Sequence, residues 1–220
     1  RALTDLGVPV RAVNRTGARP ELMPDSVEVV SADAHDPARL VASAQGAAVV
    51  YQALNPEYHR WAEDFPALQR GALAAARAAG ARYVSVENLY MYDSSQVMTE
   101  ESRVAPVSGK GVLRARMARE VAEAHSRGEV RASQLRSSDY FGPGVTQSAM
   151  GSMVFQRLLD GKSAQIAGSA DQLHSFAYIA DVGRAAAELG LHEEACGQVW
   201  LTAHGAAVTQ GEMVAAAAGG

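Results

Sequence analysis

The stretch AAARAAGARYVSV, residues 74–86, joins the end of a helix to a buried strand and decides the fold class. Its alanines continue a helical segment that we expect to run from Trp61 to Ala79. Gly80 follows as the residue that ends this helix. The run Tyr83–Val86 then has the aromatic and β-branched side chains typical of a strand. The same order of helix, glycine and strand recurs on both sides of this stretch.

On the N-terminal side we expect a helix that begins at Asp36, the N-cap, and Pro37 and runs to Val41. Three strands are also expected there, at Val8–Val13, Val27–Val30 and Ala47–Tyr51. On the C-terminal side a helix from Ser108 to Ser126 leads into a strand at Val130–Leu135. Strands that alternate with helices of this length indicate βαβ units with right-handed crossovers. The sequence therefore predicts an α/β fold with a doubly wound parallel sheet.

Past Met150 the alternation loosens, with short strands expected at Ala164–Ala167 and Ser175–Tyr178. We therefore expect two parts, residues 1–150 and a smaller part at residues 151–220. The chain has a formal net charge of -4, which argues against a nucleic-acid partner. Its single cysteine, Cys196, excludes an internal disulfide and favours a reducing, cytoplasmic setting. No apolar run is long enough to span a bilayer, so no membrane partner is expected.

Several segments together resemble the extended short-chain dehydrogenase/reductases, the NAD-dependent epimerase/dehydratase family. Residues 2–15, ALTDLGVPVRAVNR, are similar to the family's first helix and second strand. Residues 136–144, RSSDYFGPG, resemble its RPxxxYGPG turn, and residues 176–182, FAYIADV, resemble a further segment. Val84–Asp93 is similar to the strand and loop that carry its Ser-Ser and Val-Tyr-Gly residues. The resemblance implies a Rossmann-type, nucleotide-binding domain at 1–150, whose first strand and glycine-rich loop would precede Arg1. It also implies a small, incomplete substrate-binding lobe at 151–220.

The resemblance also implies which residues bind a dinucleotide. Arg15 follows the second strand, where the Rossmann plan places an acid for the ribose 2′-hydroxyl or an Arg for a 2′-phosphate. Since no acid stands there, we expect NADP, with NAD possible; the alternative is a solvated surface Arg. Asp33 resembles the family's adenine-contacting acid, and a loop-capping Asp is an equal alternative. The expected cofactor-binding residues are Asn14, Arg15, Asp33, Ala34, Gln52, Ala53, Leu54, Arg114, Ser137 and Ser138.

The expected catalytic residues depart from the family pattern. The family uses a Ser or Thr and a Tyr-x-x-x-Lys on the following helix. Here Asn88 falls at the Ser/Thr position, Lys110 at the Tyr position and Arg114 at the Lys position. Asn88 could donate to a carbonyl oxygen, Lys110 could act as a general acid, and Arg114 would stay charged. The alternative is a site that has lost its redox chemistry, while Tyr90 is an outside candidate for the proton donor.

These features leave open what the chain does. One hypothesis is an NAD(P)-dependent oxidoreductase or epimerase-type enzyme acting on a carbonyl or sugar-nucleotide-like small molecule. The alternatives are a non-catalytic dinucleotide sensor that has lost the Tyr and a fragment without a ligand. The resemblance suggests a homodimer through the helices at Trp61–Ala79 and Ser108–Ser126. No metal site is expected, because the six histidines and Cys196 form no pair with ligand spacing.

Overall fold

The computed structural model describes residues 1–145, 148, 150–166 and 168–219. The chain forms two compact units, Arg1–Arg136 with Arg184–Leu201, and Ser137–Gly183 with Thr202–Gly220. None of the described helices combines the length and the apolar character needed to cross a bilayer. The assignment of cofactor binding to residues 1–150 and of substrate binding to residues 151–220 stays a prediction.

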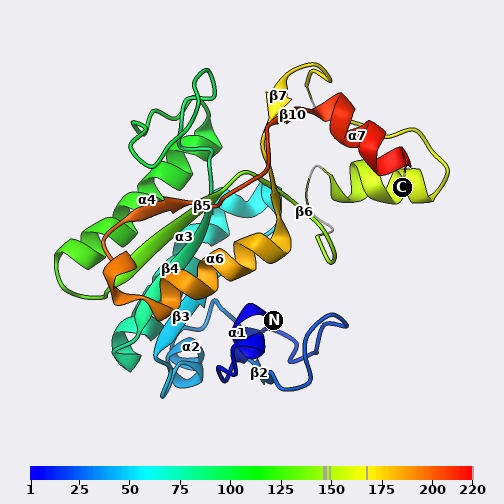
Figure 1. The fold of residues 1–220 in the computed structure, drawn as a ribbon. Coiled ribbons are helices and arrows are strands. Elements are labelled where there is room, and N and C mark those ends of the chain that lie inside the picture. Colours follow the sequence, from blue (N-terminus) through cyan, green and yellow to red (C-terminus); the bar gives the residue numbers. More distant parts are fainter. Residues whose placement is uncertain (146–147, 149, 167, 220) are drawn as a thin grey trace. The chain divides into compact units, whose positions relative to one another are not determined.

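The first unit is built on a parallel sheet with the strand order β3–β4–β5–β9 (Figure 1). Its strands are β3 (Val49–Gln52), β4 (Arg82–Asn88), β5 (Ala132–Ser137) and β9 (Val199–Leu201). A second, two-stranded parallel sheet pairs β1 (Arg11–Asn14) with β2 (Glu28–Ser31). The predicted parallel α/β architecture is therefore confirmed, with its strands distributed over two sheets.

Capping side chains and a glycine set several of the helix ends in the first unit. Helix α2 (Pro37–Ser43) starts at Asp36, whose carboxylate accepts from the backbone amides of Ala38 and Arg39. Helix α3 (Trp61–Ala79) ends at Gly80, which has a left-handed φ of 63°. Helix α4 (Gly109–Ser126) is N-capped by Ser108. The shorter helices are α1 (Ala2–Asp5), η1 (Tyr58–Arg60) and η3 (Glu193–Ala195).

The core of the first unit lies between the sheet and helices α3 and α4. Tyr83 on β4 is fully buried among Ala76 of α3, Val121 of α4 and Ala132 of β5. On the opposite face of the sheet, Leu135 lies near Leu189 in the part of helix α6 (Ile179–Leu191) that belongs to this unit. Burial on both faces is expected of a parallel sheet covered by helices, and it leaves the ends of the strands as the accessible positions.

The second unit has two small sheets. Strand β6 (Asp139–Phe141) pairs in parallel with β8 (Phe176–Tyr178), and β7 (Leu173–His174) pairs antiparallel with β10 (Val208–Thr209). A π-helical turn, η2 (Gly151–Phe155), continues into α5 (Gln156–Leu159), and α7 (Gln210–Gly219) follows β10.

The strand expected at Ala164–Ala167 was wrong for residues 164–166, which form no strand, and residue 167 lies outside the described residues. The amide of Gln165 donates to the carbonyl of Met153, while Ala164 and Ile166 pack against buried Met150 and Val154. The apolar residues of this segment therefore join the core of the second unit without strand pairing.

Candidate cofactor and active site

The loop after β1 is shaped by the side chain of Asn14. Its Oδ1 accepts from the amides of Thr16 at 3.1 Å and Gly17 at 2.7 Å, and its Nδ2 donates to the carbonyl of Ala18. Gly17 has a φ of 69° and lies close to Ser31 on β2. This arrangement is an Asx turn, in which the side chain replaces a backbone hydrogen bond. Asn14 thus organises the loop, and it leaves Arg15 exposed at the end of the strand.

The loop after β2 brings Asp33 into electrostatic range of Arg15. The Asp33 carboxylate accepts from the amide of His35 at 2.9 Å and lies 3.1 Å from its Nδ1. The hydrogen bond from the His35 amide is the main cause that lowers the pKa of Asp33, and the charge of Arg15 contributes weakly. The carbonyl of Ala34 lies near Gly71 of α3. The structure therefore brings Arg15 and Asp33 together at one edge, and it also shows Asp33 capping its own loop.

The third cofactor segment follows β3. Gln52 is the last residue of the strand and is 2% exposed, while Ala53 is exposed and Leu54 is half-buried. Gln52 lies in register with Ser85 of β4, so both strands reach this edge of the sheet. Because parallel strands present their carboxyl ends on one side, a ligand at this edge would meet residues from successive loops.

Asn88, at the carboxyl end of β4, lies next to the first turn of α4. Its Oδ1 accepts from the amide of Tyr90 at 3.2 Å. The carbonyl oxygen of Tyr90 would lie 2.3 Å from a Cβ atom added to Gly111, so the segment after β4 touches the α4 backbone there. Two of the three segments predicted to be catalytic are therefore neighbours in the structure.

Lys110 and Arg114 are one turn apart on α4 and both contact aromatic rings. The Lys110 Nζ lies 3.7 Å from the centroid of the Tyr58 ring and donates to the carbonyl of Tyr58. It is also 5.3 Å from the Trp61 ring. The Arg114 guanidinium is 4.6 Å from the Phe65 ring, and this side chain is 4% exposed. These contacts stabilise two positive charges beside α3 and η1.

The two serines of the turn motif belong to the second unit. Ser137 is 1% exposed, and its hydroxyl forms a hydrogen bond with the hydroxyl of Thr202. The buried Oγ of Ser138 has no hydrogen-bond partner among the described residues. A buried hydroxyl without a partner costs free energy, and Ser138 therefore retains an unused donor and acceptor.

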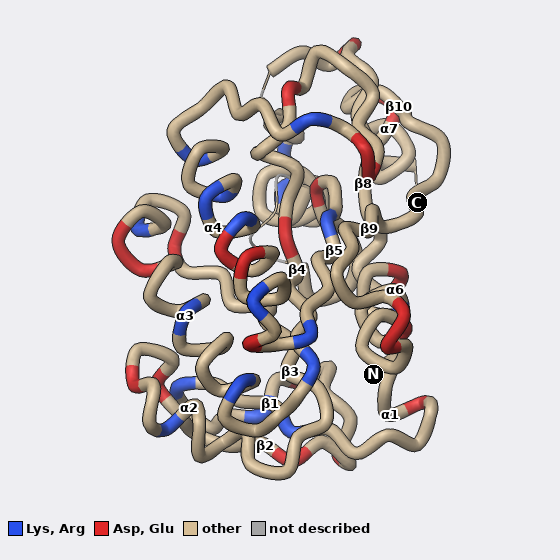
Figure 2. Tube along the Cα trace, turned by 90° about the vertical axis from the view of Figure 1, so that its left-hand side faces the viewer, with Lys and Arg blue, Asp and Glu red and all other residues tan. Residues whose placement is uncertain are grey.

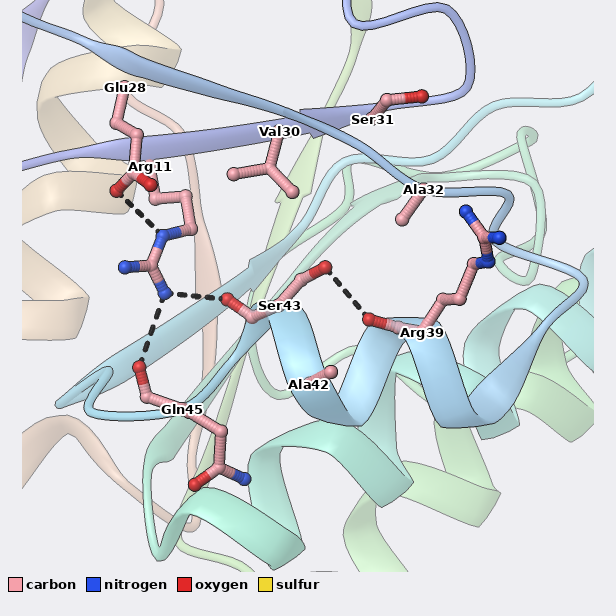
Figure 3. Close-up of a pocket in the computed structure, with 9 residues that line it drawn as sticks. All are labelled: Arg11, Glu28, Val30, Ser31, Ala32, Arg39, Ala42, Ser43 and Gln45. Carbon is pink, nitrogen blue, oxygen red and sulfur yellow. Dashed lines mark hydrogen bonds and ion pairs between the residues drawn. The ribbon is translucent and has the colours of Figure 1, made fainter.

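A pocket of about 420 Å³ lies between the β1–β2 pair and α2 (Figure 3). Arg11 reaches from β1 to the C-terminal end of α2, where its Nη1 donates to the carbonyls of Ser43 at 2.8 Å and Gln45 at 3.2 Å. Its Nε pairs with Glu28 of β2 at 2.7 Å. The charged Arg11 head group is already bonded within the chain, so the pocket offers a ligand little from this side chain.

Sequence reasoning did not identify a buried ion pair between neighbouring strands. Glu87 of β4 and Arg136 of β5 are 3% and 5% exposed, and the carboxylate Oε2 lies 3.1 Å from the arginine Nε. The available signal was an opposite charge directly after each of two expected strands, Tyr83–Val86 and Val130–Leu135, since a buried carboxylate requires a partner. Basic and acidic residues both occur along α4 (Figure 2). Among them, the exposed side chains of Arg119 and Glu123 form an ion pair at 3.6 Å.

Comparisons with known proteins place this geometry in context. Residues 1–200 match the NAD dependent epimerase/dehydratase family. No curated protein matches the chain. MoeE5 in complex with UDP-glucose and NAD is 25% identical, with a TM-score of 0.81 over 99% of this chain and 75% of that one.

Two further solved structures share the fold at lower identity. The dTDP-glucose 4,6-dehydratase DesIV from Streptomyces venezuelae, with NAD and TYD bound, is 18% identical, with a TM-score of 0.78 over 95% of this chain and 70% of that one. An epimerase from Methanothermobacter thermautotrophicus is 17% identical, with a TM-score of 0.82 over 98% of this chain and 70% of that one.

Proposed function

Because the chain belongs to the NAD dependent epimerase/dehydratase family, we propose that it binds NAD(P) at the carboxyl edge of its parallel strands. The proposed chemistry is of the oxidoreductase or epimerase type, on a carbonyl or sugar-nucleotide-like small molecule. The observation that carries the proposal is that Arg15 and Asp33 follow the carboxyl ends of two strands that pair in parallel and in register. Two of the solved structures described above contain NAD, which supports a nicotinamide dinucleotide as the cofactor here.

The described residues fit the adenosine end of such a cofactor. An exposed guanidinium at Arg15 suits a 2′-phosphate, because it offers several donors and a permanent charge. Asp33 keeps an ionised carboxylate close by, and Ala53 is exposed at the end of the neighbouring strand β3. We therefore propose NADP as the preferred form, with Asn14 positioning Arg15 and with Ala34, Gln52 and Leu54 forming the surrounding wall.

The pyrophosphate would need the glycine-rich loop that the sequence analysis expects before Arg1. Among the described strands, β1 pairs only with β2, and β3 pairs only with β4. Each therefore has one open edge, and unpaired edge groups favour the addition of a strand. A further parallel strand added between these two edges would bring the loop after it to the same carboxyl rim as Arg15 and Asn88.

NAD(P), when bound, supplies the hydride acceptor or donor, and the residues of the chain bind and polarise the substrate. Asn88 would donate its amide to a carbonyl oxygen. Arg114, buried and permanently charged, would supply positive potential and hold ribose hydroxyls. Lys110 would act as general acid only after leaving the Tyr58 ring and carbonyl, where its ammonium is now bound. Ser137 and Ser138 are proposed as cofactor-binding residues through their hydroxyls.

The oligomeric state belongs to the same proposal. We infer a homodimer through α3 and α4, which are the longest helices among those described. The family match favours the enzyme over a non-catalytic sensor, since neither the family nor the solved relatives have a name that indicates sensing.

The test uses the protein together with any segment that precedes Arg1 in its natural chain. Titration with NADPH and NADH, followed by cofactor fluorescence, is expected to give tighter binding of NADPH. Arg15→Asp is expected to reverse this preference, while Arg19→Asp, at an arginine whose guanidinium is bonded to the carbonyls of Pro24 and Val27, serves as the control in the same loop. Absence of binding at millimolar cofactor would end the proposal.

A further inference from the structure

A single buried guanidinium holds both ends of the turn formed by residues 87–92. This turn begins with the last two residues of β4, Glu87 and Asn88, and includes Tyr90. Arg136, on the adjacent strand β5, bonds Glu87 through Nε at 3.1 Å, and its Nη1 donates to the Tyr92 hydroxyl. Glu87, Tyr92 and Arg136 are all at most 5% exposed. The first and the last residue of the turn are therefore bonded to the same side chain.

The remaining polar atoms of this cluster are also bonded. Glu87 Oε1 accepts from the Ser85 hydroxyl at 2.9 Å and from Gln134 Nε2 at 3.3 Å. Gln134 Oε1 accepts from Arg136 Nη2 at 3.3 Å, and Gln134 Nε2 also donates to the carbonyl of Ala118 on α4 at 2.6 Å. A buried network in which each member is bonded resists rearrangement, because moving one group leaves another unpaired away from water. The bonds of Arg136 to Glu87 and Tyr92, which we call the clamp, thus hold the turn on β5, and the bond of Gln134 to Ala118 connects this network to α4.

The middle of the turn faces the first turn of α4. The Tyr90 ring centroid is 5.8 Å from that of Trp61 on α3, and the Tyr90 carbonyl lies against Gly111. The amide of Tyr90 bonds the Asn88 side chain. Lys110 precedes Gly111 and lies near the same Trp61 ring. The turn that carries Asn88 and Tyr90 is therefore a neighbour of Lys110, which is also proposed for catalysis.

We propose that Arg136 is a positioning residue, whose two-ended clamp on Glu87 and Tyr92 fixes the orientation of Asn88 and Tyr90 at the active site. The significance for catalysis rests on the proposed function, whereas the clamp itself is a property of the free protein. Arginine suits this role because its planar guanidinium has N–H groups that point in different directions and can bind two acceptors at once. The ammonium of lysine, on a flexible side chain, does this much less well.

The experiment compares Tyr92→Phe and Arg136→Lys with the matched control Arg131→Met. Arg131 lies just before β5, is exposed and pairs with Glu193 at 2.8 Å. All proteins carry Trp200→Phe, which leaves Trp61 as the reporter beside Tyr90. Three properties are measured without cofactor: amide hydrogen exchange of residues 88–92, the fluorescence emission of Trp61 and the urea midpoint of unfolding. Because no cofactor is present, a negative result for the clamp is distinguishable from a failure of the proposed function.

We expect exchange at residues 88–92 to be about tenfold faster in Tyr92→Phe, the effect of losing one hydrogen bond to a charged group. Amides of α3 and β5 should stay protected, Trp61 emission should change, and Arg131→Met should match the parent. Arg136→Lys should loosen the same turn. Unchanged exchange in Tyr92→Phe would overturn the proposal, and so would faster exchange spread evenly over the first unit, because that would indicate a structural role only.

Discussion

Replacing Gly111 with alanine tests the contact between the turn after β4 and helix α4. In an ordinary helix this change stabilises by up to ~1 kcal/mol, because glycine loses more backbone entropy on folding. Here the new Cβ would lie 2.3 Å from the Tyr90 carbonyl oxygen, 3.0 Å from Pro106 Cβ and 3.2 Å from Ser108 Oγ. The first neighbour is backbone and cannot rotate away. Overpacking of this kind costs roughly 1–3 kcal/mol, and a clash with backbone belongs in the upper half of that range. After the gain of up to ~1 kcal/mol is subtracted, we expect a net loss of about 1–2 kcal/mol.

The assay is urea unfolding followed by tryptophan fluorescence. Trp61 and Trp200 both lie in the first unit, so their emission reports on the part of the chain that contains the substitution. Gly109→Ala is the matched control two residues earlier in α4, where an added Cβ meets nothing within 4 Å. It should leave the free energy of unfolding unchanged or raise it by up to ~1 kcal/mol, as an unhindered Gly→Ala change in a helix does. If Gly111→Ala were as stable as the parent, the described contact of the Tyr90 carbonyl with α4 would be wrong.

Three further predictions follow from buried or bonded groups. Burial raises the pKa of Tyr51 to about 12 from an ordinary 10.0. Because the folded state then holds this proton more tightly than the unfolded state, the free energy of unfolding should fall as the pH rises from 10 towards 12. Tyr51→Phe should reduce this dependence on pH, as measured by urea unfolding at several pH values. Tyr83→Phe removes a buried hydroxyl that has no hydrogen-bond partner among the described residues, so the urea midpoint should stay the same or rise, and a clear fall would contradict the assignment. His35→Ala removes one of the two His35 bonds that lower the pKa of Asp33, so carbon-detected NMR should find this pKa closer to 3.8, and an unchanged titration would refute the contribution of the His35 ring.

Local signals in the sequence predicted the elements that depend on local interactions. The helix at Trp61–Ala79 was predicted with the bounds that the structure has, and Asp36 is the N-cap that the sequence indicated. Both depend on side chains and backbone groups within a few residues of one another. The strand expected at Val8–Val13 instead begins at Arg11, because its limits are set by pairing with β2, which begins at Glu28.

The parts of the site that were missed depend on residues far apart in the chain. Glu87 and Arg136 are 49 residues apart, and Lys110 lies 52 residues from the Tyr58 carbonyl that it bonds. The family motif assigned a catalytic role to Lys110 from its spacing to Arg114. The contacts of the Lys110 side chain, in contrast, depend on how α4 packs against α3 and η1. The catalytic roles of Asn88, Lys110 and Arg114 therefore stay predictions, to be judged by turnover.

The most direct measurement is the map of backbone amide shifts in the full-length protein during titration with NADPH. If the cofactor binds at the carboxyl edge of the parallel strands, the largest shifts should fall at Arg15, Asp33, Ala53 and Asn88, which follow or end four different strands. Saturable shifts confined to other surfaces, such as the pocket beside Arg11 and α2, would contradict the account.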